Sequence, residues 1–175
     1  MLGIFKRQKI REDELAADFV EAFLPTVYCG FPEIAALINE SIEFVDSPGL
    51  KEEDCDRFLL IALAANTMAI QRHFTSRYDQ AIIREVLERV AREGKVSYGP
   101  LVNTVNQTEK FIAKVNHPSK NLVYGMSKAV FYKYDLSKYQ EEYFRNMNSP
   151  NPVFLKRLDE AMEVYLWNWQ EFSDR

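Results

Sequence analysis

The stretch FLLIALAANTMAI, residues 58–70, decides the fold class of this chain. Its first eight residues, 58–65, are apolar on every side of a helix instead of along one stripe or at alternate positions. A helix with this pattern is surrounded by other helices. The stretch is well short of the ~20 apolar residues that cross a bilayer. We therefore predict a buried central helix over about residues 52–77 and no membrane span.

Helical periodicity continues on both sides of this stretch, whereas strand signals are nearly absent: no Asn-Gly or Asp-Gly turn joins two alternating runs. Pro25 is expected to kink or end the first helix. Apolar spacing and the breaks between periodic segments predict further helices at about 12–25, 32–45, 79–93, 100–115, 119–134, 137–147 and 152–172. Short connections favour an all-α, compact bundle of about seven to eight helices.

The 175 residues and their 47% hydrophobic content suffice for one domain without disulfides or metal. We expect a flexible N-terminal tip over residues 1–10 and a single helical domain over 11–175. Cys29 and Cys55 lie in helical patterns and are interpreted as reduced core thiols. The first positive charges follow a short apolar tip, the reverse of the order in a secretory signal. These features predict a cytoplasmic protein.

The net charge of −4 is unevenly distributed along the chain. Residues 12–56 contain thirteen acidic side chains and one basic side chain, whereas residues 57–128 contain eleven basic and five acidic ones. Such segments usually pack together or form solvated faces, and the alternative is a polarised surface that steers a charged partner. The acidic total weakens attraction to phosphates, so we do not expect a nucleic-acid partner.

Motifs of the common enzyme classes are absent. The sequence has no Gly-rich phosphate loop, no Gly-x-Ser-x-Gly elbow, no His-Glu-x-x-His or Glu-x-x-His metal pair, and no close pair of cysteines for zinc. We therefore predict no cofactor, no metal site and no catalytic residue, and favour a protein that is not an enzyme. A catalytic site dispersed along the sequence remains the third alternative for function.

One polar stripe on the central helix could line a ligand pocket. On a helix with 100° per residue, Asn66, His73 and Arg77 lie within about 40° of one another. His73 and Arg77 would then face an anionic small molecule. The ordinary alternative is that the helix leaves the core after Thr67 and its polar groups meet water. This stripe supports our second hypothesis for function, a helical sensor of small molecules.

The last predicted helix suggests an interface. Its apolar seam has helical spacing: Leu155, Leu158, Met162, Tyr165, Trp169 and Phe172. Trp167 lies about 170° from the centre of that seam, near Val164. Either another part of the chain covers this tryptophan, or it anchors a partner or a second subunit. Our leading hypothesis is a protein-interaction or regulatory module, with self-association into a homodimer as one form.

Overall fold

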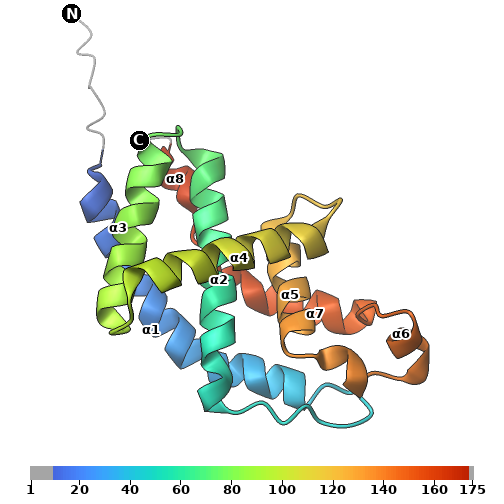
Figure 1. Ribbon diagram of the computed structural model, residues 1–175. Coiled ribbons are helices and arrows are strands. Elements are labelled where there is room, and N and C mark those ends of the chain that lie inside the picture. The colour runs from blue at the N-terminus through green and yellow to red at the C-terminus, as the bar shows by residue number, and fades with distance from the viewer. Residues whose placement is uncertain (1–9, 174–175) are drawn as a thin grey trace, which may run out of the picture.

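The computed structural model describes residues 10–173, which form an all-α bundle without a β-strand (Figure 1). The α-helices are α1 (Glu12–Asn39), α2 (Cys55–His73), α3 (Tyr78–Glu93), α4 (Tyr98–Asn116), α5 (Leu122–Lys133), α6 (Glu142–Asn146), α7 (Pro152–Met162) and α8 (Trp169–Ser173). Three short 3-10 helices join them: η1 (Glu52–Asp54), η2 (Leu136–Tyr139) and η3 (Glu163–Tyr165). The predicted fold class is confirmed.

The helix α2 is the predicted central helix. It contacts α1, α3, α4, α5 and α8, and in Figure 1 α4 crosses directly over it. Its residues 61–67 are all buried, as the all-round apolar pattern indicates. The helix is shorter than predicted: it ends at His73, where Phe74 turns to an extended conformation with φ −121° and ψ 159°. The predicted continuation to Arg77 is therefore wrong.

The two helices predicted at 12–25 and 32–45 are one helix, α1, which contains Pro25 and Pro32. Both prolines are exposed. Each removes one backbone donor, but on the solvent side water can replace it. The buried face continues past both prolines through Val27, Phe31 and others, and α1 packs against α3, α2 and the segment of α7 and η3. Packing of this face outweighs the cost of the two prolines.

The helix α1 ends at Asn39, six residues before the predicted end at Val45. The Asn39 side chain explains this end, because it accepts from the Leu50 N–H and donates to the Leu50 carbonyl, both at 2.8 Å. The chain turns away, and Ile42 and Val45, which lie within the helix predicted at 32–45, are 88% and 68% exposed.

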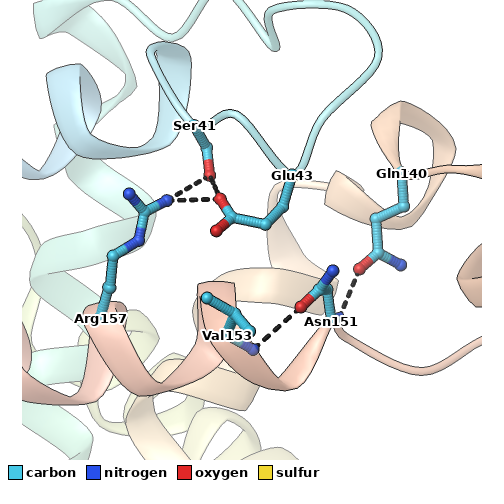
Figure 2. A network of polar contacts seen from close by, with 6 residues as sticks. All are labelled: Ser41, Glu43, Gln140, Asn151, Val153 and Arg157. Atoms are coloured by element: carbon cyan, nitrogen blue, oxygen red, sulfur yellow. Dashed lines mark hydrogen bonds and ion pairs between the residues drawn. The ribbon is translucent and has the colours of Figure 1, made fainter.

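A polar network fixes the loop after α1 to α7 (Figure 2). Arg157 donates to the Ser41 hydroxyl at 2.8 Å and pairs with Glu43 at 2.5 Å, and Ser41 donates to the same Glu43 oxygen. Beside it, the side chain of Gln140 accepts from the Asn151 N–H at 2.6 Å, at the start of α7. This network holds the loop at the end of the bundle that carries α6 (Figure 1).

The last two predicted helices are each divided. Residues 137–147 form η2 and α6, and residues 152–172 form α7, η3 and α8, with a break at Leu166–Asn168. The residues of the predicted apolar seam nevertheless face the core. All of them are buried except Phe172, which is half-buried. Burial of these side chains does not require a continuous helix, so the pattern predicted the inward residues correctly but not the secondary structure.

Two further predictions concern the cysteines and the N-terminal tip. Cys55 is buried, but Cys29 is exposed on α1, so its prediction as a core thiol is wrong; both are free of disulfides. The predicted flexible tip lies outside the described residues except for Ile10, which packs against the core and accepts a hydrogen bond from Tyr78.

By length and composition alone α1 could cross a membrane, with a mean hydropathy of 1.2 over 18 residues, one third of them buried. A single helix of this kind is weak evidence, so the absence of a span stays a prediction.

Candidate functional site

The structure does not bring the predicted ligand residues Asn66, His73 and Arg77 together. Asn66 is fully buried at the middle of α2, His73 is exposed in its last turn, and Arg77 lies beyond its end, beside the first residue of α3. The stripe is lost because α2 ends before Arg77. His73 instead lines a shallow pocket of about 420 Å³, which it shares with Trp167.

Asn66 has a structural role in the core. Its amide nitrogen donates to the carbonyls of Ala62 and Tyr165, both at 2.8 Å. Its side-chain oxygen accepts from the Trp167 backbone N–H and from the Trp169 ring N–H, both at 3.0 Å. The amide thus binds polar groups at the break between α7 and α8. With four hydrogen bonds inside the chain, Asn66 has no free donor for a ligand.

Trp167 is half-buried by the chain itself, which is the ordinary alternative for this residue. Its ring stacks on Phe172 with 4.8 Å between centroids and lies 5.3 Å from the ring of Phe19. The angle calculated for a continuous helix does not apply, because the helix ends before Trp167. Val164, its proposed companion, is 69% exposed. The interface predicted at Val164 and Trp167 remains untested.

A different site is an open hollow of about 900 Å³ between α1, α2, α3, α4 and the turn from α3 to α4, which we call the groove. Its wall is mainly apolar. The apolar residues are Leu24 of α1, Leu59 and Leu60 of α2, Val90 of α3, Val96 of the turn and Leu101 of α4. Three charged side chains, Asp56, Glu93 and Lys95, also line it. Because acidic and basic groups are both present, the groove has no single strong charge.

Large apolar and aromatic side chains are exposed around the groove. Tyr28 on α1 is 50% exposed and Val96 in the turn is 53% exposed, and both line the groove; Tyr98, two residues after Val96 but outside the lining, is 40% exposed. Burial and the nearby Cys55 and Asp56 raise the pKa of the Tyr28 hydroxyl, so it remains a neutral hydrogen-bonding group at physiological pH. Exposed apolar residues scattered singly are common, but several beside one apolar hollow indicate a contact surface.

The turn from α3 to α4 holds Val96 at the groove. Gly94 ends α3, and Lys95 adopts the left-handed conformation with φ 51°. The Val96 N–H then donates to the Ala91 carbonyl at 2.9 Å, which closes the end of α3. This arrangement fixes the backbone of Val96 while its side chain stays largely in solvent.

The sequence did not reveal the groove because its wall combines separate elements. We predicted that polar residues in the second half of α2 line a pocket. The groove is instead lined by Asp56, Leu59 and Leu60 from the first turns of α2. A usable signal was present in α1: between Glu21 and Glu33 its exposed residues carry no charge. They are Ala22, Pro25, Thr26, Tyr28, Cys29 and Pro32.

Residues 10–173 contain no cluster of three or more His, Cys, Asp or Glu side chains that could hold a metal ion. Burial raises the pKa of the Cys55 thiol to about 11, so this thiol is not a ready nucleophile at neutral pH. The groove therefore offers apolar contact and a few polar groups, and the described residues around it do not form a recognisable catalytic arrangement.

The fold and the groove define an all-α bundle with an open, mainly apolar groove on its surface. No protein-family model matches the sequence, no curated protein is significantly similar to it, and no solved structure significantly matches its fold.

Proposed function

We propose that this protein is an interaction module that binds an apolar segment of a partner protein in the groove. The observation that carries this proposal is the apolar hollow of about 900 Å³ with Tyr28 and Val96 half-exposed on its rim. Helices that bind in grooves insert apolar side chains spaced by about three or four residues. The uncharged surface of α1 beside the groove extends the area that such a helix could cover.

The mixed charges of the groove predict how the partner binds. With Asp56 and Glu93 opposed by Lys95, steering by net charge contributes little. We expect binding to depend on apolar burial and to change only weakly with salt. A partner held mainly by charge would instead lose affinity steeply as the ionic strength rises.

Val96→Asp tests this function. Helical peptides selected from a display library against the wild-type protein provide the ligand, and calorimetry measures their Kd. Because the new carboxylate must lose water when a peptide covers it, we expect Val96→Asp to weaken binding about tenfold or more, which is about 1.4 kcal/mol. Val96 is exposed, so the fold should tolerate the change.

The matched control is Val164→Asp, because Val164 is also an exposed valine and lies outside the groove. It should leave the Kd unchanged. If Val164→Asp weakens binding and Val96→Asp does not, the interface lies at Val164 and Trp167, as the sequence suggested, and our assignment of the groove is wrong.

A small apolar ligand is the second candidate function. The volume of the groove lies within the range of about 300–1,000 Å³ that small-molecule sites occupy, and Ser97 and Thr104 offer hydroxyl groups to orient a ligand. Native mass spectrometry of the purified protein tests it. A reproducible added mass that is lost in Val96→Asp would favour a ligand over a peptide.

A further inference from the structure

Glu109 lies on the side of α4 that faces α2, five residues after Thr104 in the groove wall. It is partly buried, and its Oε1 atom lies 2.5 Å from the Thr67 hydroxyl oxygen. Thr67 itself is fully buried in α2. The contact therefore joins the two helices in a place largely removed from water.

The hydrogen atoms at this contact can be counted. The Thr67 hydroxyl oxygen lies 2.8 Å from the Ala64 carbonyl as well as 2.5 Å from Glu109. A hydroxyl has one hydrogen, and a carbonyl oxygen can only accept. If Glu109 is ionised, two acceptors compete for that hydrogen. If Glu109 carries a proton, it donates to Thr67 while Thr67 donates to Ala64, and both contacts are hydrogen bonds.

The surroundings of Glu109 support the protonated form. Burial, the main cause, raises the pKa of this carboxyl group, while hydrogen bonds from Thr67 and Gln71 lower it in part. No charged group of the neighbouring α2, α3 or α5 is among the causes. Lys133 of α5 points to the ring of Phe111 at 4.5 Å, and Arg72 of α2 donates to the Lys120 carbonyl at 2.7 Å. These cations have other partners.

We propose that Glu109 is a proton-dependent lock between α4 and α2 that regulates the groove. When it is protonated, two hydrogen bonds in series hold α4 against α2. When it ionises, one of them is lost and a desolvated carboxylate remains, which favours movement of α4 away from α2. Because Pro100, Leu101 and Thr104 belong to α4, that movement alters the groove wall. The second part of this inference rests on the proposed function, whereas the lock itself does not.

The direction of the pH effect follows from the raised pKa. The folded protein holds this proton more tightly than the unfolded chain does, so the contribution of Glu109 to stability is complete below the ordinary value of 4.5. It is lost as the pH rises from 4.5 through the folded-state pKa. The lock is thus closed at low pH and opens at higher pH.

Glu109→Gln is the decisive variant, because its neutral amide can donate to Thr67 at every pH. In the wild type we expect carbon-detected NMR to show that the Glu109 carboxyl titrates above 4.5. Amide hydrogen exchange in α4, corrected for its intrinsic pH dependence, should become about tenfold faster above that midpoint, as expected when one buried hydrogen bond is lost. Glu109→Gln should remove this step. Glu88→Gln, an exposed side chain on α3, should keep it.

The groove is followed in the same titration with the dye 8-anilinonaphthalene-1-sulfonate, which fluoresces on apolar surfaces. We expect its fluorescence to change at the Glu109 midpoint in the wild type and in Glu88→Gln, but not in Glu109→Gln. Titration of Glu109 at or below 4.5, or an unchanged α4 exchange profile in Glu109→Gln, would overturn the lock. If α4 exchange shows the lock but the dye fluorescence does not change, only the control of the groove by Glu109 is overturned. Failure of the proposed function shows separately, as peptide binding that Val96→Asp does not weaken.

Discussion

Replacing Asn66 with alanine is expected to lower the free energy of unfolding by about 3–5 kcal/mol. The change removes an amide that holds two backbone groups of the last segment, at Tyr165 and Trp167, and the ring N–H of Trp169. Each buried polar group that loses its partner costs about 1–3 kcal/mol, and the effects of neighbouring groups are not simply additive. Urea denaturation followed by circular dichroism measures the loss.

The same variant should also loosen the end of the chain. The rings of Trp167 and Trp169 pack edge-on with 5.0 Å between their centroids, and both residues bind Asn66, so their fluorescence should shift to longer wavelength as water reaches them. The matched control is Asn103→Ala, an exposed asparagine on α4, which should change stability by no more than about 0.5 kcal/mol. A loss below 1 kcal/mol in Asn66→Ala would mean that water replaces the amide and that the hydrogen bonds are not a structural requirement.

Asn66 also shows where sequence reasoning failed at the candidate site. On a helical wheel its polarity indicated a pocket wall, because position on a helix does not reveal what packs against it. The partners of its amide lie about 100 residues later in the chain, at Tyr165 and Trp167. A contact between such distant segments leaves no periodic signal, so the pattern could identify an unusual residue but not its role.

The elements that were predicted well depend on local signals. The helix α3 was predicted at 79–93 and is found at Tyr78–Glu93, because an amphipathic pattern and Gly94 define it within its own sequence. The helix α1 was predicted poorly because the rule that proline ends a helix is not purely local. Pro25 and Pro32 are tolerated on the exposed side, and which side is exposed depends on how α1 packs against the other helices.

The groove depends even more on tertiary structure. Its wall needs Leu24, Leu60 and Val96 from different elements to meet, and nothing in their spacing along the chain indicates this. In the sequence, the uncharged exposed surface of α1 is only a segment without charged residues, and nothing shows which of its residues share a side. It became informative once the helix was known to continue past Pro25, because then Tyr28 and its neighbours lie on one side of a single long helix.

The close approach of the last segment to α1 leads to a second large effect. Gly30→Ala is expected to destabilise the fold by about 2 kcal/mol, although alanine usually stabilises a helix interior by about 1 kcal/mol over glycine. A methyl group at Gly30 would lie 2.2 Å from the Tyr165 hydroxyl oxygen and 3.0 Å from the ring carbon that bears it. The ring cannot move freely, since Tyr165 is buried and packs edge-on against Phe58 with 4.8 Å between centroids.

A double-mutant cycle with Tyr165→Phe separates this steric cause from a general effect on α1. Removing the hydroxyl removes the nearest atom, so the double variant Gly30→Ala/Tyr165→Phe should recover about half of the loss, with the remainder due to the ring carbons at 3.0 and 3.2 Å. Gly99→Ala is the matched control, because a methyl group there meets no atom within 4 Å and should be neutral or stabilising. If Gly30→Ala behaves like Gly99→Ala, then α1 and the segment that contains Tyr165 are not packed as tightly as this contact requires.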